Sequence, residues 1–106
     1  MIYELREYTA VPGRMPALIR RFNDHAMPGL AKHGMEVLFI SLTDFGPNTM
    51  NEVIYVIRHE SYADLEAKWK AFFSDPEWIE AKRKSEEDGP LVAQLSRRIL
   101  SANPFV

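Results

Sequence analysis

The order of strand-like and helix-like segments is the feature that most constrains what this chain can fold into. Segments with strand-like patterns are expected at Ile2–Thr9, Met35–Phe45, Val53–His59 and Leu95–Ser101. Helical patterns separate the first strand from the second and the third strand from the fourth. The resulting order, β-α-β-β-α-β, is that of the split βαβ or ferredoxin-like plan. We therefore predict an α+β domain with an antiparallel sheet and helices on one face.

The first helical region carries an apolar stripe and two signals for its end. The stripe recurs at helical spacing and consists of Met15, Leu18, Ile19, Phe22 and Ala26. Pro28 cannot continue a helix without losing a backbone hydrogen bond, so we expect a break or kink near Ala26–Met27. Gly34 is expected to cap the last turn, because glycine readily adopts positive φ.

The second helical region is predicted to contain two helices, each with its own cap. Ser61 and Asp64 have the spacing of a capping box, and Asp75 followed by Pro76 is typical of a second helix start. The apolar stripe of the first helix consists of Tyr62, Leu65, Trp69, Phe72 and Phe73. Trp69, Phe72 and Phe73 could line an aromatic pocket, although at helical spacing we expect them to lie in the core.

The second and third predicted strands are apolar on both faces. Met35 to Leu42 is nearly all apolar, and Val53 to Ile57 repeats the pattern. A strand that is apolar on both faces is normally buried on both faces. Because the helices of this plan cover only one face, we predict a homodimer through the sheet, forming a dimeric α/β barrel.

Size and composition narrow the classes of protein. A chain of 106 residues is expected to form one domain, residues 1–106. The net charge of −2 argues against a nucleic-acid partner, and the lack of cysteine excludes disulfides and thiolate metal sites. No apolar run approaches the roughly 20 residues that span a bilayer. The chain starts directly in a predicted strand, so we expect a cytoplasmic protein without a membrane span.

Several segments in order resemble the NIPSNAP family. They are Tyr3–Tyr8 followed by Pro12-Gly13, His33-Gly34, Gly46-Pro47 before Asn51–Val53, and Asp75–Trp78. The resemblance covers essentially the whole chain and implies a ferredoxin-like domain that pairs as a dimeric α/β barrel. It implies little about activity. The aromatic-rich third strand of many members is changed here, since Tyr55, Ile57 and His59 occupy its places, so no catalytic residue is carried over.

Four polar side chains are the candidate ligand-binding residues. Arg6 and Tyr8 share one face of the first strand with Glu4. Arg6 could contact an anion or a carbonyl group of a small molecule, or form a structural pair with Glu4. Tyr55 lies on the third strand. His25 lies near the expected helix break, where it could act as a base or ligand, or interact with a helix end.

Two functions follow as hypotheses, and the catalytic residues are unknown. The first is a dimer that binds a small apolar molecule or a protein partner. The alternative is a cofactor-free monooxygenase or isomerase acting on a hydrophobic aromatic substrate, which rests on analogy with other dimeric barrels. No metal or cofactor motif is present, so we expect neither. The enzyme hypothesis predicts an enclosed cavity of roughly 300 Å³ or more with convergent polar groups.

Overall fold

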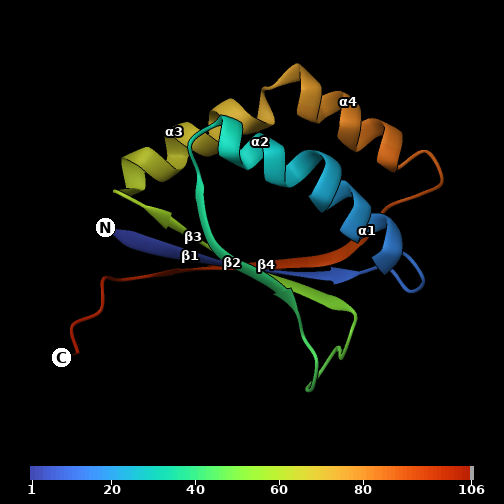
Figure 1. The fold of residues 1–106 in the computed structure, drawn as a ribbon, viewed down its shortest axis with the longest axis horizontal. Helices are drawn as coiled ribbons and strands as arrows, with labels where there is room; N and C mark the ends of the chain where they lie inside the picture. Colours follow the sequence, from blue (N-terminus) through green and yellow to red (C-terminus); the bar gives the residue numbers. More distant parts are fainter. Residues whose placement is uncertain (106) are drawn as a thin grey trace.

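The computed structural model describes residues 1–105, and its elements follow the predicted order. The strands form one antiparallel sheet in the order β2-β3-β1-β4, and the helices lie together on one side of it (Figure 1). The predicted ferredoxin-like α+β fold is therefore confirmed, and the sheet of a single chain is open. The elements are β1 (Ile2–Ala10), α1 (Met15–Arg21), η1 (Phe22–Ala26), α2 (Met27–Lys32), β2 (Glu36–Leu42), β3 (Glu52–His59), α3 (Tyr62–Phe73), α4 (Pro76–Ser85) and β4 (Val92–Leu100).

The first helical region runs on where a break near Ala26–Met27 was expected. The segment η1 is a π-helix, in which the N–H of Met27 bonds the carbonyl of Phe22, five residues earlier. This wider turn lies just before Pro28, so α2 begins with the proline in its first turn, where a missing N–H costs little. The irregularity expected at the proline is thus absorbed by the preceding π-turn.

The predicted caps are present. The N–H of Asp64 donates to Ser61 Oγ at 3.1 Å, and that of Glu77 donates to Asp75 Oδ1 at 2.9 Å. Gly34 has φ +74°, and the N–H of Met35 bonds the carbonyl of Leu30 at 2.9 Å, which closes α2. These caps fix where α3, α4 and β2 begin and hence how the helices lie over the sheet.

The face of the sheet beneath the helices carries the core and a polar cluster. Alternate residues of β1 and β3 point toward the helices, as the period of two predicted. Apolar members of this set, such as Val53 and Ile57, pack with Leu18, Leu30 and Phe72 from the helices. Glu4, Arg6 and His59 lie on the same face and are also buried.

Among residues 1–105, no layer covers the opposite face of the sheet in the single chain (Figure 1). Phe39 is 55% exposed there, so the predicted burial of β2 on both faces would require a partner chain. β2 is an edge strand with an irregular register between Val37 and Phe39.

Tyr62 and Phe73, predicted in the buried stripe of α3, are 64% and 52% exposed.

Candidate functional site

Glu4 is the centre of a buried polar cluster between the sheet and α3. Its carboxylate is fully buried and accepts hydrogen bonds at both oxygens. Oε2 accepts from Arg6 Nη1 at 3.0 Å and Arg97 Nε at 2.6 Å. Oε1 accepts from Trp69 Nε1 at 2.7 Å and lies 2.9 Å from His59 Nε2. Because donors from β1, β3, β4 and α3 converge on it, Glu4 ties the helix layer to the sheet.

The electrostatics of this cluster favour charged forms. Burial alone would raise the pKa of Glu4, but hydrogen bonds from Trp69, His59 and Arg6 outweigh it and hold that pKa below its ordinary value. Burial alone would lower the pKa of Arg6, but Tyr8, Tyr55 and Glu4 outweigh it and raise that pKa. The Arg6–Glu4 pair proposed from sequence as a structural contact is present.

Arg6 also binds two tyrosine hydroxyls. Its Nε lies 2.8 Å from the hydroxyl oxygen of Tyr55, and its Nη2 lies 2.9 Å from that of Tyr8. The two hydroxyl oxygens are 2.8 Å apart. A guanidinium only donates hydrogen bonds, so both hydroxyl oxygens act as acceptors toward Arg6. Three of the four residues predicted as ligand-binding candidates are thus in direct contact.

The protons of these hydroxyls can be counted. Each hydroxyl carries one proton, and one of the two lies between the oxygens. Within residues 1–105, no acceptor for the other proton lies at hydrogen-bond distance. Burial is the main cause that raises the pKa of Tyr55 well above its ordinary value, so that hydroxyl stays protonated at neutral pH. The pair therefore has one donor to offer.

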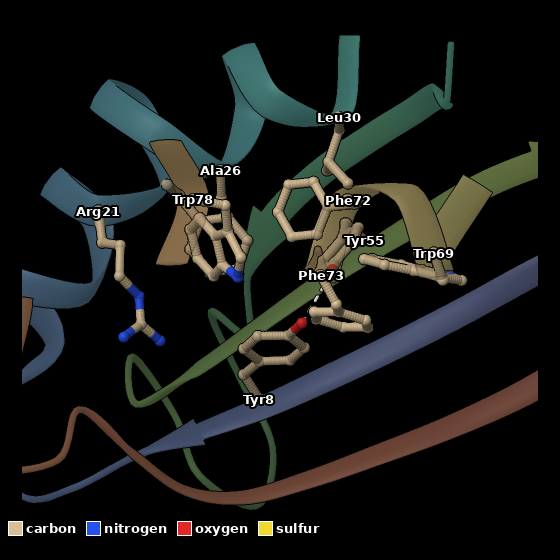
Figure 2. Close-up of a pocket in the computed structure, with 10 residues that line it drawn as sticks. Tyr8, Arg21, Ala26, Leu30, Tyr55, Trp69, Phe72, Phe73 and Trp78 are labelled. Atoms are coloured by element: carbon tan, nitrogen blue, oxygen red, sulfur yellow. Dashed lines mark hydrogen bonds between the residues drawn. The ribbon is translucent and has the colours of Figure 1, made fainter. Parts of the chain in front are cut away.

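A small cavity lies beside the two hydroxyls. It has a volume of about 40 Å³, and we call it the aromatic cavity. Figure 2 shows Tyr8 beneath it, Arg21 and Trp78 on one side, and Trp69 and Phe73 on the other. Its complete lining is Tyr8, Arg21, Phe22, Ala26, Leu30, Tyr55, Trp69, Phe72, Phe73 and Trp78. The volume exceeds the space that one water molecule needs and falls below the roughly 300 Å³ of common ligand sites.

The aromatic walls are ordered by edge and stacking contacts. Phe73 stacks on Trp69 with ring centroids 5.1 Å apart, and Phe72 lies 4.8 Å from Trp78. The Arg6 guanidinium lies 4.3 Å from the ring centre of Trp69. A place in the core and a place in a pocket wall were the two alternatives for the α3 aromatics. Trp69 and Phe72 have both, because they are core residues that also line the cavity.

His25, the fourth predicted residue, lies apart from the other three. It is exposed on η1 and lines two outer grooves, one between α1 and α4 and one near Asp75. The helix break expected beside it is absent, because η1 continues the helix with Phe22 and Ala26 facing the core. No group of three or more histidine or carboxylate side chains within residues 1–105 could hold a metal ion.

Sequence reasoning missed several members of the site. His59 and Arg97 share a sheet face with Tyr55 and Glu4, and the period of two along each strand could have placed them there. Trp69 was placed on the buried stripe, but its indole donor was not matched with Glu4. No local pattern distinguishes Arg21 from Arg20, although Arg21 is buried.

The fold and site define a class of protein: a ferredoxin-like α+β domain with an aromatic cavity and a buried arginine–tyrosine cluster between its sheet and helices. The sequence model of the NIPSNAP family matches residues 3–106. The chain therefore belongs to the NIPSNAP family, as the resemblance in its sequence indicated. The comparison with curated proteins found no match.

Solved structures with the same fold come from several bacteria. An uncharacterised NIPSNAP-like domain protein from Burkholderia xenovorans is 24% identical with a TM-score of 0.84, covering 99% of this chain and 87% of that chain. A NIPSNAP family protein of unknown function from Agrobacterium tumefaciens is 23% identical with a TM-score of 0.84, covering 100% and 91%. A putative antibiotic biosynthesis monooxygenase from Nitrosomonas europaea is 10% identical with a TM-score of 0.66, covering 96% and 98%. At these identities the likeness shows the fold alone. Within residues 1–105, no helix is long and apolar enough to cross a membrane.

Proposed function

We propose that this protein binds a small, largely apolar molecule in the aromatic cavity through an oxygen atom of that molecule. The observation that carries the proposal is the unused hydroxyl proton of the Tyr8–Tyr55 pair, both members of which line the cavity. A donor without an acceptor in a buried site favours a ligand that supplies one. The positive charge of Arg6, in contact with both hydroxyls, strengthens them as donors to a carbonyl or anionic oxygen.

The size of the cavity limits the ligand. At about 40 Å³ it accepts only a few heavy atoms unless a wall moves. Phe73 is the wall residue most suited to move, because its side chain is half exposed at the end of α3. Ligands of five carbons or more therefore bind with Phe73 displaced, and a longer ligand would extend past Phe73 toward solvent.

The test uses two ligands of nearly equal shape that differ in the acceptor. 2-Pentanone carries a carbonyl oxygen, and 2-methyl-1-pentene replaces that oxygen by a methylene group. We expect the ketone to shift the backbone amide signals of cavity residues in NMR titrations and to bind better than the alkene. The double change Tyr8→Phe with Tyr55→Phe should remove the preference, because either hydroxyl left alone would still offer its proton. Tyr62→Phe, at an exposed tyrosine, should keep the preference. Equal binding of the two ligands, or binding of neither, would overturn the proposal.

We also propose that the protein partner is a second copy of the chain, bound at the uncovered sheet face. Register places Phe39, Val56 and Leu5 side by side across β2, β3 and β1 on that face. Phe39 is exposed there in the single chain. An apolar row of this kind on a monomer normally marks an interface.

Native mass spectrometry tests the pairing. The wild-type protein should be a dimer, and Phe39→Glu should shift it to monomer by placing charge in the apolar row. Phe45→Glu is the matched control, because Phe45 is 96% exposed in the loop between β2 and β3 and should leave the dimer intact. A monomeric wild-type protein would contradict the proposal.

The alternative, a cofactor-free monooxygenase or isomerase acting on an aromatic substrate, ranks second. The fold it shares with the Nitrosomonas protein supports it only as an analogy. The aromatic cavity is far smaller than the roughly 300 Å³ that the enzyme hypothesis predicts. The groove between α1 and α4 reaches about 300 Å³ but is open to solvent and not enclosed, so binding of a small molecule in the aromatic cavity is the better supported proposal.

A further inference from the structure

Arg21 is a second buried arginine at the aromatic cavity, and most of its donors are unused. Its side chain projects from α1 beside Trp78 in Figure 2. The residue is 7% exposed, and only Nη1 has partners, Ser85 Oγ at 3.2 Å and Glu86 Oε1 at 3.4 Å. Within residues 1–105, Nε and Nη2 have no hydrogen-bond partner, and neither is fully buried, so both are open to solvent or a ligand.

The charge of Arg21 is weakly compensated. The side chain of Glu86 is 33% exposed and meets Arg21 at 3.4 Å, near the limit of a hydrogen bond. The groove between α1 and α4, which Arg21 also lines, carries Asp24 and Asp88. Those two acids are matched by three further cations in the same groove, Arg14, Arg20 and Lys84. Arg21 therefore lies in a positive environment on its outer side.

A guanidinium at a cavity wall with donors free of protein partners can bind an anionic group. The flat fork of arginine matches the two oxygens of a carboxylate. The other walls of the cavity are aromatic and aliphatic, including the ring of Trp78 whose centre lies 5.7 Å from the Arg21 guanidinium. Such walls suit the apolar body of an organic acid better than a strongly hydrated inorganic anion.

We infer that Arg21 binds a carboxylate group of the cavity ligand, and that a separate carbonyl oxygen of the same ligand accepts a hydrogen bond from the Tyr8–Tyr55 pair. This inference rests on the proposed function and names its ligand class: a small carboxylate with an apolar body and a carbonyl oxygen. Arg21 and the tyrosine pair line the same cavity, so one molecule can meet both. Arg21 thus favours ligands with a negatively charged group, and the tyrosine hydroxyls favour ligands that also carry an uncharged acceptor oxygen.

The experiment compares 2-pentanone with 4-oxopentanoate, in which the terminal methyl group is replaced by a carboxylate. We expect NMR titrations of the wild-type protein to show 4-oxopentanoate binding on the order of tenfold tighter, as a charge-assisted hydrogen bond provides. Arg21→Gln should abolish this advantage, so that the variant binds 4-oxopentanoate no more tightly than it binds 2-pentanone. Arg20→Gln removes the same charge from a neighbouring exposed position and should retain the advantage.

The outcomes separate the two proposals. If wild-type protein binds 2-pentanone but gains nothing from the carboxylate, the assignment of Arg21 is overturned and the proposed function stands. If Arg20→Gln lost the preference for 4-oxopentanoate to the same extent, the assignment would be overturned as well. The preference would then come from the overall positive charge of the region and not from contact with Arg21. If neither ligand binds, both proposals fail. Should Arg21→Gln not fold, Arg21→Lys keeps the charge without the fork and is expected to lose most of the advantage.

Discussion

Arg6 and Arg21 are buried to nearly the same extent, 5% and 7% exposed, but they differ in what surrounds them. All three nitrogens of Arg6 donate hydrogen bonds, to Glu4, Tyr8 and Tyr55. Arg21 uses one nitrogen, toward Ser85 and Glu86. Burial alone therefore does not distinguish a structural charge from one available to a ligand. The saturation of its donors does, and the comparison assigns Arg6 to the architecture and Arg21 to recognition.

The largest expected effect comes from the same substitution at both arginines. Arg6→Met leaves Glu4 and two tyrosine hydroxyls with fewer partners, and we expect the free energy of unfolding to fall by about 3–5 kcal/mol. Arg21→Met replaces a weakly paired charge by an apolar side chain, and we expect the free energy of unfolding to change by less than about 1 kcal/mol. Urea denaturation measures both. Equal losses would remove the distinction between the two arginines.

The second prediction concerns the acceptor of the cluster. Glu4→Gln keeps the shape but places an amide NH₂ against N–H donors, and we expect a loss of about 3 kcal/mol in the free energy of unfolding. Glu36→Gln is the control, because that exposed carboxylate pairs with Arg58 at the surface and its loss should cost less than about 1 kcal/mol.

The stability contributed by Glu4 should depend on pH. The pKa of Glu4 is lower in the folded protein than its ordinary value of 4.5. Its contribution is therefore complete above that ordinary pKa and is lost as the pH falls through the lower folded pKa. Urea midpoints measured across this acidic range should fall more steeply for the wild-type protein than for Glu4→Gln. Parallel curves would show that other acids dominate.

Tyr55→Phe has a smaller expected effect on stability than either change at Glu4 or Arg6. It removes one hydroxyl from between Arg6 and Tyr8, but Arg6 retains Tyr8 and Glu4 as acceptors. We expect a loss of about 1–2 kcal/mol in the free energy of unfolding. A loss as large as that of Arg6→Met would mean that the hydroxyl pair is the structural centre and not an accessory to it.

The smallest effect is expected at the wall of the cavity. Phe73→Ala removes a half-exposed ring stacked on Trp69, and thermal unfolding should show a stability change of about 1 kcal/mol or less. The same change should let ligands longer than 2-pentanone bind better, because the cavity is then open at the end of α3. Unchanged ligand-size preference would show that Phe73 does not limit access.

Much of the fold could be predicted because local signals agree with one another. Two-residue periodicity placed Glu4, Arg6 and Tyr8 on one face, and the caps at Ser61 and Asp75 fixed the starts of α3 and α4. The π-segment could not be predicted, since Pro28 alone does not specify how the chain adjusts before it. The apolar surface of β2 was expected to be buried by a partner chain, and residues 1–105 of one chain provide no layer to cover it.

The candidate site was predicted only in part, because it depends on contacts distant in sequence. Arg6, Tyr8 and Tyr55 meet because β1 pairs with β3, and that pairing follows from the fold. Trp69 and Arg97 reach Glu4 from α3 and β4, and which donors converge on a carboxylate depends on side-chain rotamers. The burial of Arg21 depends on the way α1 packs against α4. His25 lies in the predicted helical region, but the helix break on which its proposed role relied does not occur, so it lies apart from the other three candidates.

The π-segment η1 also bears on how the length of this region can vary. A π-turn holds one residue more than the α-helical turn it replaces, so it can arise by a single insertion into a regular helix. Loss of one residue among Asn23–His25 would restore α-helical bonding and bring α2 into phase with α1. The fold can therefore absorb a one-residue difference in length without a new loop. A relative that is one residue shorter at this point is expected to keep the sheet, its polar cluster and the place of Leu30 beside the cavity.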